Sequence, residues 1–188
     1  MSWLRDYLPS KALVLDASAL INILGCGATE DVFKSLRRPC VVEEKVLAEI
    51  TRHPVPGLSH VKAMDALIKS RCIEVSIMNV EEYQLFISMV QAPLPKRLGS
   101  GESAALAIAS RRDLPIILDD NKARAARTAT SPGVEAISSL KLFVSASVRL
   151  GRDKLFLRDV LHNALTVARM GVPKDEKALL QKILSDLG

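Results

Sequence analysis

The sequence is poor in aromatic residues and cysteines, and it contains no long apolar run. Aromatic residues make up 4% of the 188 residues, which leaves little material for a platform on which nucleic-acid bases would stack. The three cysteines, Cys26, Cys40 and Cys72, form no C-x-x-C pair, and their odd number leaves at least one thiol unpaired within the chain. We expect all three to be reduced. The three histidines are scattered, so the sequence predicts no zinc site.

The longest apolar segment, residues 12–24, is interrupted by Asp16 and Asn22 and is too short to span a bilayer. The N-terminal residues place acid and base before any apolar stretch, unlike a secretory signal. We therefore expect a cytoplasmic protein without a membrane span. The hydrophobic content of 48% is typical of a globular chain, and the net charge of +5 favours a polyanionic partner.

Short apolar runs alternate with amphipathic segments through most of the chain. The predicted strands are residues 12–16, 40–42, 72–76, 115–118 and 134–137. The predicted helices are residues 19–24, 29–36, 43–51, 59–70, 80–90, 102–110 and 121–128, the first capped by Ser18. This alternation predicts an α/β fold with a parallel sheet and helices on both faces.

The last fifty residues show no strand pattern. They predict two or three helices, with breaks near Gly151 and at residues 171–173. We therefore expect one main domain over residues 1–137 and a helical extension over residues 138–188 that packs on the same domain.

Acidic residues follow the predicted strands. Asp16, Asp119 and Asp120 lie at strand ends, whereas Glu102 opens a predicted helix and Glu49 lies within another. Because sites in open α/β sheets lie beyond the carboxyl ends of the strands, the fold can bring these acids to one crevice. Each acid also has a simpler interpretation, as a helix cap or as a favourable charge at a helix N-terminus.

Four acids in one crevice repel one another and raise one another's pKa values. A hard divalent cation such as Mg²⁺ or Mn²⁺ resolves that conflict, because it prefers carboxylate oxygens. Such an ion polarises a phosphate oxygen and lowers the pKa of a bound water. The pattern is therefore typical of metal-assisted phosphodiester hydrolysis.

The order of the acidic segments resembles the PIN-domain family, over roughly residues 12–137. Four segments carry the resemblance, Leu13–Ile21 (LVLDASALI), Val46–Ile50 (VLAEI), Gly101–Ala109 (GESAALAIA) and Ile117–Arg124 (ILDDNKAR). The resemblance implies a three-layer α/β/α sandwich with a mainly parallel central sheet, followed here by C-terminal helices. It also implies a hydrolase, a VapC-like endoribonuclease that depends on Mg²⁺ or Mn²⁺.

The resemblance also assigns roles to particular residues. The catalytic and metal-binding acids that it implies are Asp16, Glu49, Glu102 and Asp120. Ser18 would support the site through a hydrogen bond. Leu118 stands where the fourth motif usually has threonine, so Asp119 is a further candidate ligand that can share or take the role of Asp120.

Basic residues flank two of the acidic motifs and are candidates for RNA contacts. They are Lys96, Arg97, Lys122, Arg124 and Arg127. If several of them touch phosphates, binding should weaken steeply with salt. The expected partners are an RNA substrate, a small antitoxin if the protein is a toxin, and a second copy of the chain in a homodimer.

Three other interpretations stay open. The segment Gly99–Ala104 matches G-x-G-x-x-A, so the Gly99–Gly101 loop is a candidate nucleotide-binding loop, although Pro93 and Pro95 argue against the strand that should precede it. A non-catalytic PIN-like RNA-binding module is the second. A phospho-receiver domain is the third, but its acid pair is expected early in the chain rather than late.

Overall fold

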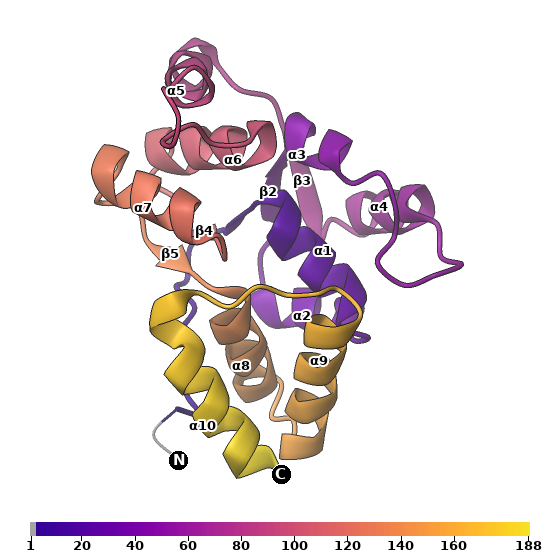
Figure 1. Cartoon of the computed structure of the whole chain (residues 1–188). Helices are drawn as coiled ribbons and strands as arrows, with labels where there is room; N and C mark the ends of the chain where they lie inside the picture. The colour runs from indigo at the N-terminus through magenta and orange to yellow at the C-terminus, as the bar shows by residue number, and fades with distance from the viewer. Residues whose placement is uncertain (1–2) are drawn as a thin grey trace.

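The structure, a computed structural model, describes residues 3–188. A five-stranded, all-parallel sheet with the order β3-β2-β1-β4-β5 lies at its centre (Figure 1). The strands are β1 (Val14–Leu15), β2 (Cys40–Glu43), β3 (Ile73–Ser76), β4 (Ile116–Ile117) and β5 (Ala136–Ile137). In register, Val14 of β1 pairs with Val41 of β2 and with Ile116 of β4.

Helices cover both faces of this sheet. The first six are α1 (Ala17–Gly25), α2 (Thr29–Leu36), α3 (Glu44–Glu49), α4 (His60–Lys69), α5 (Val80–Val90) and α6 (Ser100–Arg111). The others are α7 (Asn121–Thr130), α8 (Ser139–Arg149), α9 (Lys154–Thr166), α10 (Lys177–Leu187) and the 3-10 turn η1 (Lys174–Glu176). In Figure 1, α5 and α6 lie above the sheet, and α8, α9 and α10 lie below it. The predicted α/β/α fold is confirmed.

The central strands are short and buried on both faces. Val14, Leu15, Ile116 and Ile117 are fully buried, as expected for parallel strands with helices on each side. Helix α6 packs directly on β1, β2 and β4. Its buried run, residues 104–109, contains four alanines, which let it lie close to the sheet.

Two local predictions were wrong. Ser18 does not cap the first helix. Strand β1 ends at Leu15, and Asp16, the next residue, is the N-cap of α1. Helix α6 begins at Ser100 rather than Glu102, because Gly99 adopts the extended N-cap conformation. The element before α6 is α5, so the Gly99–Gly101 loop does not follow a strand as a dinucleotide-binding loop must.

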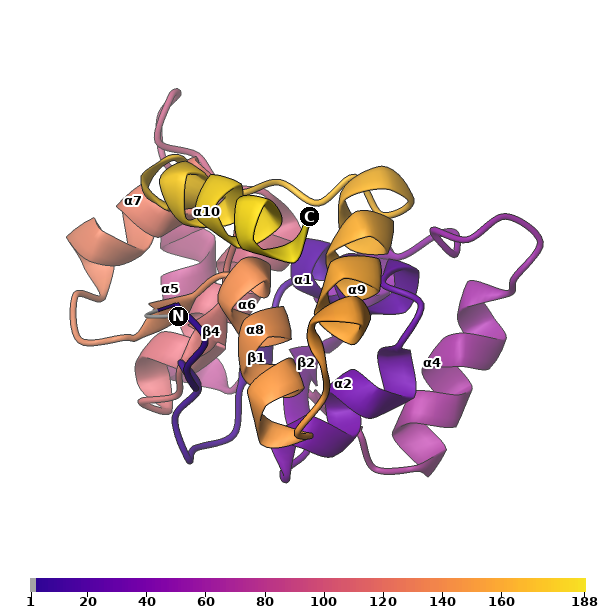
Figure 2. The same cartoon turned by 90° about the horizontal axis from the view of Figure 1, so that it is seen from below.

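The C-terminal helices α8, α9 and α10 form a group at the lower end of the molecule in Figure 1, and they face the viewer in Figure 2. Helix α8 packs on α2 and α9, α9 also contacts α1, and α10 packs on α9. The breaks after α8 and α9 fall where they were predicted. Within residues 3–188, every helix is too short or too polar to cross a bilayer.

Candidate active site

Asp16 occupies the end of β1 and the start of α1. Its Oδ1 accepts a hydrogen bond of 2.7 Å from the backbone N–H of Ala19, and the Ser18 hydroxyl donates to both carboxylate oxygens at 2.9 Å. Only 1% of Asp16 is exposed, and no cation among residues 3–188 pairs with it. When it is ionised, this carboxylate is therefore a buried negative charge that only neutral donors compensate.

Glu102 and Glu49 are both oriented by the N-terminus of α6. Glu102 Oε2 accepts from the backbone N–H of Gly99 at 3.1 Å, and Glu49 Oε1 accepts from that of Gly101 at 2.6 Å. Gly101 leaves no room for a side chain, since a Cβ there would lie 2.7 Å from Glu49 Cδ. The absence of a side chain at this position lets Glu49, 52 residues earlier in the chain, reach the start of α6.

The two adjacent aspartates after β4 have different surroundings. Asp119 is buried and accepts hydrogen bonds from Asn22 Nδ2 at 2.9 Å, Ser139 N at 2.7 Å and Ser139 Oγ at 2.5 Å. Asp120 is exposed, caps α7 and accepts at Oδ1 from the N–H of Ala123 at 2.8 Å. Both oxygens of Asp119 are thus engaged by the protein, whereas Asp120 Oδ2 accepts no hydrogen bond from residues 3–188.

These carboxylates act on one another electrostatically. Burial raises the pKa of Asp16 to about 7, and the charges of Asp119 and Glu102 add to the rise. Burial also raises the pKa of Glu102, and the charges of Asp120 and Glu49 raise it further. Electrostatic influence thus links Asp16 to Asp119 and Glu102, and links Glu102 to Asp120 and Glu49, and we refer to these five acids as the acid cluster.

The cluster is not a closed cage. Within residues 3–188, no three His, Cys, Asp or Glu side chains converge tightly enough to count as a preformed metal site. Asp16, Glu49, Glu102 and Asp120 each accept from a backbone N–H at one carboxylate oxygen, and the other oxygen of each accepts from no backbone N–H within residues 3–188. The donor set consists of carboxylate oxygens alone, which is the chemistry that Mg²⁺ and Mn²⁺ prefer.

The five predicted basic residues fall into two groups. Lys96, Arg97 and Lys122 are exposed, and Lys122 lies close enough to Glu102 to lower the pKa of that carboxyl. Arg124 instead donates to the Leu118 carbonyl oxygen at 3.2 Å, and its Nη2 lies within 4 Å of two C-terminal acids. The Nε of Arg127 is buried and has no hydrogen-bond partner within residues 3–188.

Sequence reasoning missed several residues around the cluster. Asn22 and Ser139 hold Asp119, and burial raises the pKa of Glu43, which lies at the end of β2. Glu43 carried a usable signal, because it is an acid at a strand end, next in the sheet to β1. Glu176 carried no such signal in the sequence, because only the packing of the C-terminal segment brings its charge near Asp119.

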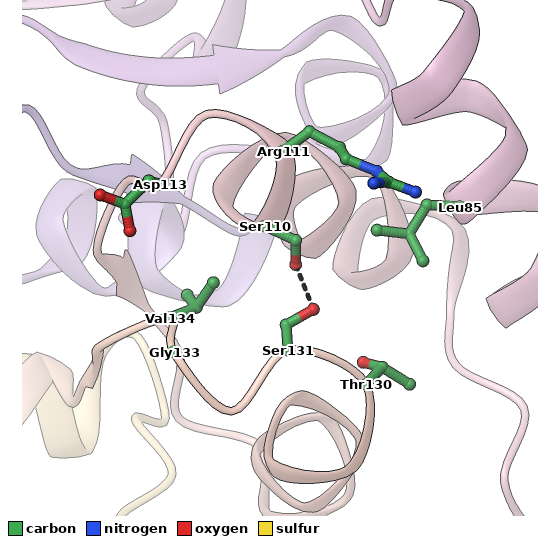
Figure 3. A pocket seen from close by; sticks show the side chains of 8 residues that line it. All are labelled: Leu85, Ser110, Arg111, Asp113, Thr130, Ser131, Gly133 and Val134. Atoms are coloured by element: carbon green, nitrogen blue, oxygen red, sulfur yellow. Dashed lines mark hydrogen bonds between the residues drawn. The ribbon is translucent and has the colours of Figure 1, made fainter.

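A hollow of about 270 Å³ at the other end of α6 is a separate feature (Figure 3). Ser110 Oγ and Ser131 Oγ lie 2.5 Å apart across it, and Arg111 and Asp113 stand at its rim. Since α6 rises about 1.5 Å per residue, Ser110 lies about 12 Å along the helix from Glu102. This hollow therefore does not belong to the acid cluster.

Comparisons with known proteins agree with this geometry. A family model described as a PIN domain, DUF3368, matches residues 12–152, about three quarters of the chain. The matched range includes every acid of the cluster and ends just after α8. The comparison with curated proteins and the comparison with solved structures found no match. With its parallel sheet, its acids at the strand ends and this match, the chain belongs to the PIN-domain family.

Proposed function

We propose that the protein is a metal-dependent endoribonuclease that hydrolyses RNA phosphodiester bonds. PIN domains are generally nucleases that use divalent metal ions, so the family supports nucleic-acid hydrolysis. The observation that carries the proposal is that the negative charge of Glu102 acts on the buried carboxyl of Asp16 and raises its pKa. Two acids 86 residues apart in the sequence share one electrostatic environment, and each of them couples to a further acid.

The residues of the cluster fit a hard divalent cation. Asp16 is buried without a compensating positive charge, and a buried carboxylate in that state is costly unless it binds a cation. The four residues that would hold the ion are Asp16, Glu49, Glu102 and Asp120. When bound, Mg²⁺ or Mn²⁺ would polarise a phosphate oxygen and lower the pKa of the attacking water.

The protein's own contribution is to position these groups. Ser18 and the start of α1 fix the orientation of Asp16, and Gly101 fixes that of Glu49. Asp119 has both oxygens engaged by Asn22 and Ser139, so we assign it the orienting role and give ligation to Asp120. We choose Asp120 as the ligand because its Oδ2 accepts no hydrogen bond from residues 3–188 and is available to bind an ion.

The RNA backbone would lie along the exposed cations next to the cluster. Lys122, beside Glu102, is the best placed, and Lys96 and Arg97 precede the same helix. Arg124 and Arg127 are the weaker candidates, because Arg124 is paired within the protein and Arg127 is partly buried. The attacking nucleophile is water, so the acids act as ligands rather than as covalent catalysts.

The test is cleavage of a labelled RNA with Mn²⁺, with Mg²⁺ and with EDTA. We expect Asp16→Asn and Glu102→Gln to abolish metal-dependent cleavage while circular dichroism shows an intact fold. Asp159→Asn, an exposed acid on α9, is the matched control and should cleave normally. Full activity in folded Asp16→Asn protein would refute the proposal, and RNA binding without any cleavage would favour the non-catalytic module instead.

A toxin role and a homodimer stay predictions based on the family resemblance. Growth arrest on expression, relieved by a small co-expressed antitoxin, would support the first. Analytical ultracentrifugation would decide the second, since α9 and α10 each expose a leucine, Leu155 and Leu184, that a partner copy can cover.

A further inference from the structure

A basic pocket of about 510 Å³ opens beside α1, on three segments that are far apart in the sequence. We call it the α1 pocket. Its lining comes from α1, from the loop after α3 and from the loop after α9. The lining residues are Ile21, Arg52, His53, Pro54, Pro56, Val167, Ala168 and Arg169.

The α1 pocket adjoins the acid cluster. Ile21 follows Asp16 by five residues, which is about 7.5 Å along a helix axis. Arg52 follows Glu49 by three residues, which span at most about 10 Å. In Figure 1 the segment that joins α9 to α10 passes below α1. Residues 167–169, at the start of this segment, line the third side of the pocket.

The third side is held firmly against α1. A Cβ added to Gly25 would lie 2.7 Å from Ala168 Cβ, so the end of α1 touches this loop. The backbone N–H of Met170 donates to the Ala164 carbonyl oxygen at 2.9 Å, which ties the loop to α9. Arg169 therefore lies on a fixed stretch of backbone next to α1.

The cations of the α1 pocket are not neutralised by the protein. Arg52 and Arg169 are both exposed, and neither makes an ion pair or a side-chain hydrogen bond within residues 3–188. No aspartate or glutamate lines the pocket. This arrangement differs from that of Arg124, whose guanidinium faces two C-terminal acids.

His53 adds a neutral donor. Its Nδ1 accepts a hydrogen bond of 3.0 Å from the backbone N–H of Val55, so in the neutral ring the proton is on Nε2. The prolines on either side, Pro54 and Pro56, restrict the backbone of this loop. Two cations, one N–H donor and no charged acceptor form a set that is complementary to a phosphate group.

We propose that the α1 pocket binds a backbone phosphate of the RNA strand, with Arg52 and Arg169 as the charged contacts and His53 Nε2 as a donor. The inference rests on the proposed function for the identity of the polymer. Lys122 lies near Glu102 and the pocket adjoins Asp16, so the strand would cross the cluster between them. The apolar lining of Ile21 and Val167 suits the sugar of the bound nucleotide.

The test measures binding of a fluorescently labelled single-stranded RNA by the full chain in EDTA, where metal-dependent cleavage cannot interfere. The variants are Arg52→Ala and Arg169→Gly, the second of which suits the backbone because Arg169 has φ 57°. Arg71→Gly is the matched control, since Arg71 is also exposed with φ 56° but follows α4, at the start of β3.

We expect each pocket variant to weaken RNA binding about three- to tenfold relative to Arg71→Gly. The slope of log affinity against log salt should fall by about 0.7 for each phosphate that the variant no longer neutralises. In a cleavage assay the pocket variants should raise KM and leave kcat unchanged.

Equal affinity and equal salt slope in all three variants would overturn the proposal, whether or not the protein cleaves RNA. A loss of binding confined to the pocket variants would support it even if no cleavage were found. Failure of the pocket and failure of the nuclease proposal are therefore separate results.

Discussion

Glu176 Oε1 lies 2.9 Å from Lys141 Nζ, which joins the C-terminal turn η1 to the first turn of α8. The Ser138 hydroxyl donates to Glu176 Oε2, and Arg124 Nη2 lies 3.6 Å from Oε1. Glu176 is 3% exposed, so one buried carboxylate from the C-terminal segment neutralises cations on α7 and α8. Because Asp120 caps α7, this contact also supports the edge of the acid cluster.

We expect Glu176→Ala to lower the free energy of unfolding by about 1–3 kcal/mol, since it leaves buried donors without an acceptor. Glu176→Gln should cost less, because its amide oxygen still accepts from Ser138. Urea titration measures both. Asp175→Asn is the control, with an expected change below about 0.5 kcal/mol because Asp175 is exposed. A Glu176→Ala protein as stable as the wild type would contradict this role.

Mn²⁺ should raise the melting temperature of the wild-type protein and have no such effect on Asp16→Asn. A ligand that binds only the folded state stabilises it, by about 2.7 kcal/mol at one hundred times its dissociation constant. Without metal, Asp16→Asn should be at least as stable as the wild type. Asparagine still caps α1, and the buried charge that lacks a cation partner is gone. Equal Mn²⁺ shifts in both proteins would place the ion elsewhere.

Gly101→Ala should separate stability from activity. The new Cβ would lie 2.7 Å from Glu49 Cδ, so it displaces the end of a flexible, exposed side chain while alanine favours the helix. We expect stability to change by less than about 1 kcal/mol and cleavage to fall at least about tenfold. Gly133→Ala is the control, because nothing lies within 4 Å of its Cβ position. Unchanged cleavage by Gly101→Ala would remove Glu49 from the active site.

The ion pair between Glu82 and Arg112 predicts a pH dependence of stability. Arg112 Nε lies 2.6 Å from Glu82 Oε1, and this guanidinium holds the pKa of Glu82 below its ordinary value. The pair is therefore fully stabilising above about pH 4.5, and its contribution is lost as the pH falls through the lowered pKa. Glu82→Gln should be less stable than the wild type at pH 7.

Urea midpoints at pH 7, 4.5 and 3 check this prediction. The difference in urea midpoint between the wild type and Glu82→Gln should become smaller as the pH falls, because protonation of Glu82 removes the same charge that the substitution removes. Glu81→Gln, an exposed neighbour in the same helix turn, should show a small gap that does not depend on pH. A gap for Glu82→Gln that widened towards pH 3 would be the opposite of the expected result.

The sheet and most helix positions were predictable because they depend on local patterns. Buried parallel strands are continuous apolar runs, and the turn residues between them are visible in the sequence. Boundaries were harder where one side chain has two possible roles. Asp16 can end a strand or cap a helix, and only the packed structure shows that the aspartate, rather than Ser18, takes the cap.

The candidate acids were chosen for a different reason, and their role as ligands stays a prediction. Asp16, Asp119 and Asp120 follow strands, and parallel topology gathers the ends of those strands at one edge of the sheet. Glu102 lies in the first turn of α6 and Glu49 ends α3, so for these two the family resemblance was needed. The partners of the acids were not predictable, because contacts such as Asn22 with Asp119 join positions 97 residues apart and depend on the packing of α8. The pairing of Arg124 with C-terminal acids was invisible for the same reason.

The single tryptophan of the chain gives the molecule an internal optical reporter. Trp3 is 2% exposed, and its Nε1 donates to Asp186 Oδ2 at 2.5 Å near the end of α10. Its indole emission therefore monitors one specific event, the docking of the last helix against the first described residues. Undocking would expose the ring to water and shift its fluorescence to longer wavelength, while the acids at the sheet edge remain spectroscopically silent.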